Sequence, residues 1–166
     1  MKLEIRNLKL KIPALSGRGF TLIELVVVFA AVGIITSLGL ASLASYGNKQ
    51  TIETAALDVA DIFNLARSRS LSQVKPTVCG NNILTGYQVD ITIAANQYAI
   101  SAVCGSAYQI DSKKLPQNVS FASSSTTTVI FPLLSGRPSS SSQVVITGYG
   151  ATKTINVNTT GNVSVE

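Results

Sequence analysis

The residue in the most unusual chemical setting is Glu24, an acid at the start of a long apolar run. Residues 25–48 contain no Asp, Glu, Lys or Arg, and about 20 apolar residues suffice for a helix to cross the hydrocarbon core of a membrane. A charged side chain in hydrocarbon costs roughly 2.5–3.5 kcal/mol even on the most lenient scale. A simple anchor has no reason to carry that cost, so we expect Glu24 to have a partner, because pairing makes a buried charge tolerable.

The basic charge of the chain is concentrated before this apolar run. Residues 1–19 hold five Lys or Arg and one Glu, a net charge of +4, whereas residues 20–166 carry only +1. Basic segments that flank a membrane helix stay in the cytoplasm, so we expect a cytoplasmic N-terminus and an extracytoplasmic C-terminal part. The whole-chain pI near 9.4 therefore does not by itself indicate a nucleic-acid-binding domain.

The start of the chain could also be a secretory signal peptide, with small residues near 36–45 as its cleavage region. Two features argue against this alternative: the apolar run is longer than the apolar region of a signal peptide, and a signal peptide has no use for Glu24. A simple signal-anchored extracytoplasmic protein, with residues 1–19 uncut, is a further alternative.

The segment "SGRGFTLIELVVVFAAVG", residues 16–33, resembles the N-terminus of type IV prepilins. The shared features are a short basic leader that ends in Gly, an aromatic residue, a Glu at the fifth mature position and an apolar helix. The resemblance implies that prepilin peptidase cuts after Gly19, that residues 1–19 are removed and that the Phe20 amine is N-methylated. It also implies that Glu24 of one subunit meets the Phe20 amine of a neighbour in a filament.

Apolar residues recur at steps of three and four after the membrane-type segment, which is the period of an amphipathic helix. They are Ile52, Ala55, Ala56, Val59, Phe63 and Ala66. Pro76 ends the pattern. We predict one long helix over about residues 22–74, in which residues 20–48 form the transmembrane and assembly part and residues 49–75 the amphipathic continuation.

Residues 76–166 alternate short β-rich runs with turn residues, which predicts a small extracytoplasmic β domain. The predicted strands are 77–79, 87–93, 97–103, 119–121, 127–131, 143–147, 154–158 and 162–165. Hairpin turns are expected at 94–96, in "GYGATK" (148–153) and at Gly161. Cys79 and Cys104 are either free thiols or a disulfide, which would close a loop of about 25 residues and contribute roughly 3–3.5 kcal/mol.

Two further segments, "LARSRSLSQVKPTVCG" (65–80) and "INVNTTGNVSV" (155–165), resemble minor pseudopilins of the GspH/FimT group. The resemblance implies an α+β fold in which one long N-terminal helix packs on a small antiparallel β-sandwich. It implies a minor subunit at or near the tip of a type II secretion pseudopilus or a type IV pilus. The implied partners are other pilin or pseudopilin subunits, prepilin peptidase, inner-membrane lipid and secreted cargo.

The sequence offers little for catalysis. It has no His, so it has no Ser-His-Asp triad and no His-bearing metal site, and it has no phosphate-binding glycine loop. We expect no enzyme activity, no cofactor and no metal. The alternative function is a DNA-binding minor pilin of natural transformation. Its candidate cations are Arg67, Arg69, Lys113, Lys114, Arg137 and Lys153, but phosphate binding needs several converging charges, and we expect these cations to form an ordinary solvated surface.

Overall fold

The computed structural model of the chain describes residues 19–166, apart from the side chains of residues 37–42 and 44. The expected leader therefore lies outside the described residues, except for Gly19. The chain divides into two compact units, the first of which ends at Ala41 while the second runs from Ser42 to Glu166. Among the described residues there is one α-helix, α1 (Leu22–Ser72), and it contributes to both units.

The ends of α1 have local causes. Thr21 is the N-cap residue, because its Oγ1 accepts a hydrogen bond from the Glu24 N–H at 3.3 Å. The helix ends at Ser72, and Gln73 then takes the left-handed conformation with φ 54°, a common way for helices to stop. Among the described residues, no helix is both long and apolar enough to qualify as a membrane span. The transmembrane expectation for residues 20–48 therefore stays a prediction.

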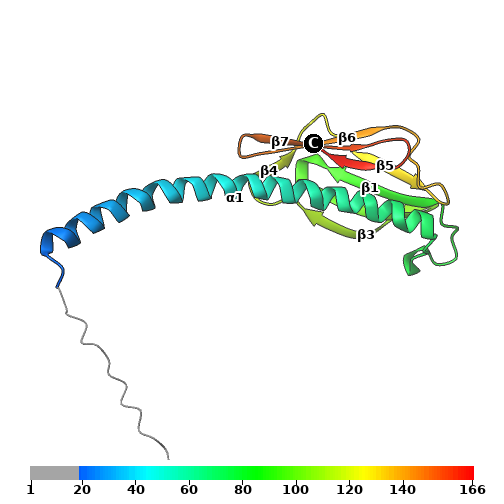
Figure 1. The fold of residues 1–166 in the computed structure, drawn as a ribbon. Helices are drawn as coiled ribbons and strands as arrows, with labels where there is room; N and C mark the ends of the chain where they lie inside the picture. The colour runs from blue at the N-terminus through cyan, green and yellow to red at the C-terminus, as the bar shows by residue number, and fades with distance from the viewer. Residues whose placement is uncertain (1–18) are drawn as a thin grey trace, which may run out of the picture. The chain divides into compact units, whose positions relative to one another are not determined.

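The second unit contains two four-stranded antiparallel sheets (Figure 1). The first has the order β3-β2-β1-β5, and the second has the order β4-β6-β7-β8. The strands of the first sheet are β1 (Gly86–Thr92), β2 (Gln97–Cys104), β3 (Ser106–Lys114) and β5 (Thr128–Pro132). Those of the second are β4 (Val119–Phe121), β6 (Ser142–Gly148), β7 (Ala151–Val157) and β8 (Val163–Val165).

The core lies between the later part of α1 and the two sheets. All six residues of the predicted apolar stripe are buried, so that prediction is confirmed. The Phe63 ring of α1 lies 6.4 Å from Phe131 of β5, and Tyr98 of β2 meets Phe121 of β4 edge to face at 6.3 Å. Because these pairs connect the helix to one sheet and that sheet to the other, the unit has a single apolar core.

The hairpin predictions are confirmed in detail. A 3-10 turn, η2 (Ile93–Ala95), and Asn96 at φ 48° connect β1 to β2. Tyr149 and Gly150, at φ 49° and 74°, form the two-residue connection between β6 and β7, as expected for a turn that needs two left-handed residues. Asn158 and Gly161 close the turn before β8 through a backbone hydrogen bond of 2.9 Å.

One strand prediction is wrong, and one strand was not predicted. Residues 77–79 form a 3-10 turn, η1 (Thr77–Cys79), because the N–H groups of Cys79 and Gly80 bond to the carbonyls three residues earlier. The strand β3 was not predicted at all. This strand lies at a sheet edge and is mostly exposed. A β-bulge also shifts its pairing with β2, where the partner of Ile100 is Asp111 but the partner of Ser101 is Gln109. Its sequence therefore lacks the alternation that marks a half-buried strand.

Candidate assembly site

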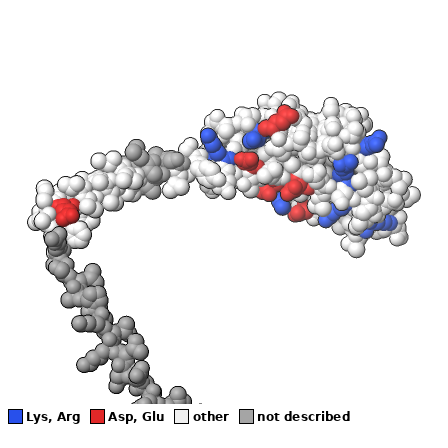
Figure 2. Space-filling view, in the orientation of Figure 1, with Lys and Arg blue, Asp and Glu red and all other residues white. Residues whose placement is uncertain are grey.

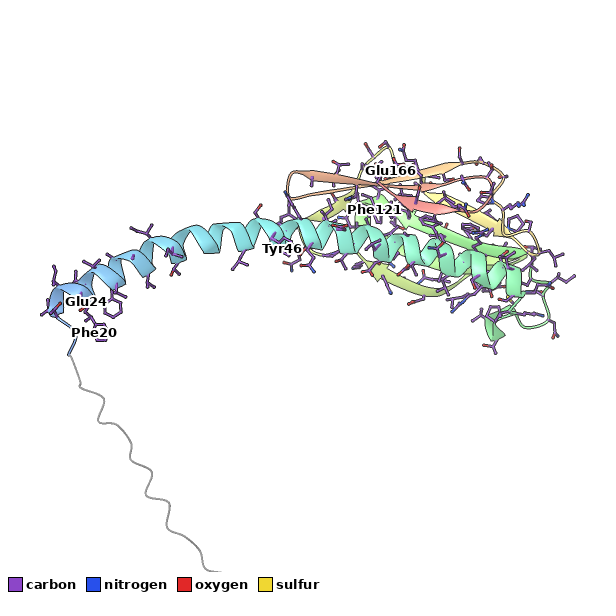
Figure 3. The ribbon with its side chains drawn as sticks, viewed as in Figure 1. Phe20, Glu24, Tyr46, Phe121 and Glu166 are labelled. Carbon is purple, nitrogen blue, oxygen red and sulfur yellow. A yellow bond between two sulfur atoms is a disulfide. The ribbon has the colours of Figure 1, made fainter. Side chains whose placement is uncertain are left out.

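The predicted processing residues lie at the start of α1 and are accessible. Gly19 and Phe20 precede the helix, and the Phe20 side chain is 79% exposed. A Cβ added to Gly19 would meet no atom within 4 Å. Figure 3 shows Phe20 and Glu24 together at this helix end, with their side chains directed outward. A peptide bond in this setting is open to a peptidase.

Glu24 has a local role that the sequence reasoning missed. Thr21 and Glu24 stand at the N-cap and N3 positions, the spacing of a capping box, and the Glu24 N–H bonds to Thr21 Oγ1. A carboxylate in the first turn also interacts favourably with the positive end of the helix dipole. The sequence signal for this capping box was the pattern "TLIE" at residues 21–24. Both effects stabilise the helix end. The hydrogen bond to Thr21 uses only the backbone of Glu24, so its exposed carboxylate remains available to a partner.

Cys79 of η1 and Cys104 at the end of β2 form a disulfide, with a Cα–Cα distance of 5.6 Å. Both side chains are buried. The bond holds the segment that follows α1 against the first sheet, so its place in the fold is structural.

Arg67 takes part in a packed contact between three segments that are distant in sequence. Its guanidinium donates hydrogen bonds to Asn162 Oδ1 and to the Thr160 carbonyl, both at 3.3 Å. An added Cβ at Gly161 would lie 2.5 Å from the Gly136 carbonyl oxygen and 2.8 Å from Arg67 Nε. This Nε is buried and has no hydrogen-bond partner within the described part of the chain.

This contact joins the two segments that carried the GspH/FimT resemblance, one at the end of the helix and one around the C-terminal glycine. The left-handed φ of 81° and the lack of space both require glycine at position 161. Arg67 therefore has a structural role at this contact. No sequence signal linked the two segments, because they are 95 positions apart.

The remaining DNA-binding candidates divide into two groups. Arg69 lies in the last turn of α1, and Arg137 follows Gly136, which packs against Leu71 of the same turn. The other group is Lys113, Lys114 and Lys153. Lys114 pairs with Gln97 at the β1–β2 hairpin, and Lys153 pairs with Ile146 near the β6–β7 hairpin. Tyr149 of that second hairpin donates a hydrogen bond to the Gln117 carbonyl, three residues after Lys114.

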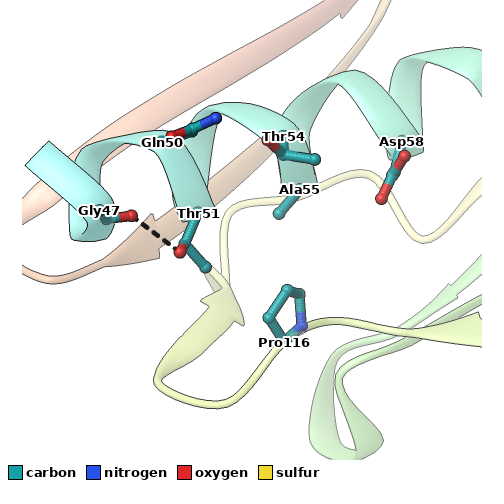
Figure 4. A pocket seen from close by; sticks show the side chains of 7 residues that line it. All are labelled: Gly47, Gln50, Thr51, Thr54, Ala55, Asp58 and Pro116. Carbon is teal, nitrogen blue, oxygen red and sulfur yellow. Dashed lines mark hydrogen bonds between the residues drawn. The ribbon is translucent and has the colours of Figure 1, made fainter.

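Pro116, which lies between Lys114 and Gln117, faces an earlier part of the helix across a surface cavity of about 320 Å³ (Figure 4). Its lining comprises Gly47, Gln50, Thr51, Thr54, Ala55, Asp58 and Pro116. Thr51 Oγ1 donates to the Gly47 carbonyl at 2.9 Å. Asp58 is the single carboxylate in the lining, so the cavity offers no acid–base pair. Among the described residues, no group of three or more His, Cys, Asp or Glu side chains forms a metal site.

The sequence matches no protein-family model and no curated protein. Among solved structures, the chain is similar to the minor pseudopilin EpsH from the type 2 secretion system of Vibrio cholerae, with a TM-score of 0.51 and 9% identity over 69% of this chain and 95% of that one. A crystal structure of the same pseudopilin gives a TM-score of 0.48, 9% identity and coverage of 70% and 94%. In agreement with the resemblance seen in the sequence, the chain has the fold of a minor pseudopilin.

Proposed function

We propose that this chain is a minor pilin or pseudopilin subunit that assembles into a type II secretion pseudopilus or a type IV pilus. The observation that carries the proposal is the exposed Gly19, Phe20 and Glu24 sequence at the start of α1, on a chain with the fold of EpsH. EpsH itself is named as a minor pseudopilin of a type 2 secretion system.

The chemistry follows from the helix start. Prepilin peptidase cleaves after Gly19, and the new amine at Phe20 is methylated but keeps its positive charge. The Glu24 carboxylate has no ion-pair partner among residues 19–166, and its burial among apolar helices is costly unless a cation meets it. The Phe20 amine of a neighbouring subunit supplies that cation and thereby sets the axial position of one subunit against the next.

The apolar part of the helix and the β domain then have different tasks. Residues 20–48 hold the subunit in the inner membrane, with the N-terminus in the cytoplasm, and later pack beside sister helices. The β domain is extracytoplasmic and presents surfaces to partner subunits and cargo at or near the tip of the filament. Neither task needs a reaction at the β domain.

Mass spectrometry of the chain from sheared filaments tests the proposal. We expect the N-terminal peptide to begin at a methylated Phe20. A Gly19→Val variant should keep residues 1–19 and be absent from the filament fraction. A chain that keeps residues 1–19 in the wild type, or that never enters filaments, would refute the proposed function.

DNA capture is the second candidate function, and one observation favours it: Arg69, Lys75 and Arg137 belong to segments that meet at the end of α1, where Gly136 packs against Leu71. Against it, Arg67 is bound to Asn162, and the three lysines lie elsewhere on the domain. A DNA titration at two salt concentrations separates the two functions, because phosphate binding weakens steeply as salt rises.

A further inference from the structure

Exposed aromatic and basic side chains gather at the end of the domain that the apolar run enters. Of the five tyrosines in the chain, two are buried and the two most exposed are Tyr46 and Tyr149, at 67% and 42%. Tyr46 stands near the end of the uncharged residues 25–48, and Lys49 is the first charged residue after them. Tyrosines and lysines at the end of an apolar helix are typical of the interface between membrane and water.

A segment of the β domain lies beside the helix at this point. Pro116 faces Gly47 and Thr51 across the surface cavity of Figure 4. Lys114 precedes Pro116 by two positions, and both residues are exposed. The segment therefore brings a second cation to this end of the domain.

The β6–β7 hairpin completes this end. The Tyr149 hydroxyl donates a hydrogen bond to the Gln117 carbonyl at 3.3 Å, and an added Cβ at Gly148 would lie 2.7 Å from the Asn118 carbonyl oxygen. Figure 1 shows the hairpin at the end of the domain where α1 enters. We call this surface the entry face and define it as Tyr46, Lys49, Lys114, Pro116 and Tyr149.

Helix geometry gives the level of the entry face along the chain. A hydrocarbon core of about 30 Å takes about 20 helical residues, and each headgroup layer adds roughly 5–7 Å, or about three to five residues. An apolar run that enters the hydrocarbon at Leu25 therefore leaves it near residue 44 and leaves the headgroup layer near residue 49. Tyr46 and Lys49 fall within that layer. Pro116 lies at the same level, because it faces Gly47.

The acids near this end lie farther from the apolar run than the lysines do. Glu53 and Lys49 line one surface cavity, but Glu53 is one helical turn farther along, about 6 Å. Asp58 is nine residues beyond Lys49. Asp111 precedes Lys114 by three residues of β3, or about 10 Å. In Figure 2 the charged atoms at the start of the domain are basic, and acidic atoms lie farther along it.

We propose that the entry face binds the lipid headgroups of the membrane that holds the apolar run, with its two tyrosines at the headgroup level and its two lysines on lipid phosphates. This contact fixes the height of the β domain above the membrane before the subunit enters a filament. The inference rests on the membrane placement in the proposed function and deepens it. We favour lipid over a neighbouring subunit, because the apolar run sets the level of the face whether or not another subunit is present.

Quenching by labelled lipid provides the test. A fluorescent label is attached to Gln117→Cys, a change that keeps the backbone carbonyl to which Tyr149 bonds. Cys79 and Cys104 are bonded to each other and do not react. The full-length chain is placed in nanodiscs of phosphatidylethanolamine and phosphatidylglycerol, some of which carry a nitroxide on the headgroup. The control label is at Ser72→Cys, which is 26 helical residues beyond Tyr46, or about 39 Å.

We expect the label at position 117 to be quenched and the label at position 72 to keep its fluorescence. Two double variants then test the side chains. One is Tyr46→Ala with Tyr149→Asn, because Asn tolerates the left-handed backbone of position 149. The other is Lys49→Glu with Lys114→Glu. Each should lower the quenching at position 117 by at least about half, whereas Tyr108→Ala and Lys75→Glu, outside the entry face, should leave it unchanged.

Cooperative urea unfolding of each variant shows that it is folded. A label at position 117 that is quenched no more than the one at position 72 would overturn the proposal. Equal quenching in the wild type and both double variants would overturn it too, because the helix alone would then hold the face at this level. A chain that does not enter nanodiscs at all would instead refute the membrane placement in the proposed function, so the two failures are distinguishable.

Discussion

Arg67 and Asn162 are joined by a hydrogen bond of 3.3 Å from the guanidinium to Oδ1, although they are 95 positions apart. The bond ties the last turns of α1 to the turn between β7 and β8. Asn158 organises that turn, because its Oδ1 accepts hydrogen bonds from the N–H groups of Thr160 and Asn162 at 3.1 and 2.9 Å. The end of the helix and the end of the chain therefore stabilise each other.

Gly161→Ala should destabilise the domain through a steric clash at this contact. An added Cβ would lie 2.5 Å from the Gly136 carbonyl oxygen. Gly105 is a matched control, because its φ of 82° equals the 81° of Gly161 within a degree while its Cβ would meet nothing. We expect a loss of about 1–2 kcal/mol for Gly105→Ala from backbone strain and a clearly larger loss for Gly161→Ala. Urea unfolding followed by tyrosine fluorescence measures both, and equal losses would contradict the clash.

Removal of the Cys79–Cys104 disulfide should lower the free energy of unfolding by about 3 kcal/mol, because it closes a loop of 25 positions. The double variant Cys79→Ala, Cys104→Ala avoids buried free thiols. Reductant should destabilise the wild type by a similar amount and leave the double variant unchanged. A double variant as stable as the oxidised wild type would show that the bond contributes nothing.

Stability should fall at high pH because of Tyr98. Burial raises its pKa to about 12, and the carboxylates of Asp58 and Asp111 add to the rise. The unfolded tyrosine loses its proton near pH 10, so between pH 10 and 12 the unfolded state binds fewer protons than the folded state. The free energy of unfolding therefore decreases with pH across this window, by up to about 2 kcal/mol. The stability that Tyr98 contributes by keeping its proton is fully present below pH 10.

Tyr98→Phe keeps the ring but has no ionisable hydroxyl, so it should lose this part of the pH dependence. Burial also raises the pKa of Tyr87, although Arg69 opposes the rise, so some decline should remain in the variant. Urea unfolding at several pH values between 9 and about 12 gives the comparison. Identical slopes for wild type and variant would rule Tyr98 out.

Substitutions at Glu24 and Thr21 should separate assembly from helix capping. Glu24→Gln keeps the backbone N–H that bonds to Thr21 but removes the charge, so we expect normal leader cleavage and much lower incorporation into filaments. Thr21→Ala removes the cap, which typically costs about 1 kcal/mol of helix stability, and should affect incorporation far less. Quantitative blots of sheared filaments compare the two. Equal effects would mean that helix capping, not the charge, is what matters at this end.

Much of the fold could be predicted because its signals are local. The buried stripe on α1 follows from the helical period, and the β1–β2 and β6–β7 hairpins follow from residues that tolerate left-handed backbone. The misses have physical causes as well. Thr77–Cys79 reads as a strand but closes into a 3-10 turn after Pro76, and the exposed edge strand β3 has no buried face to impose alternation.

The sequence by itself determined the processing motif at Gly19, Phe20 and Glu24 and the amphipathic helix, because each depends on residues a few positions apart. The tertiary structure decided which strands share a sheet, that the two cysteines are bonded and that Arg67 donates a hydrogen bond to Asn162. The two cysteines are 25 positions apart in the sequence, and Arg67 and Asn162 are 95 positions apart. These pairings depend on how the sheets and helix pack, and no local period or turn preference encodes that packing.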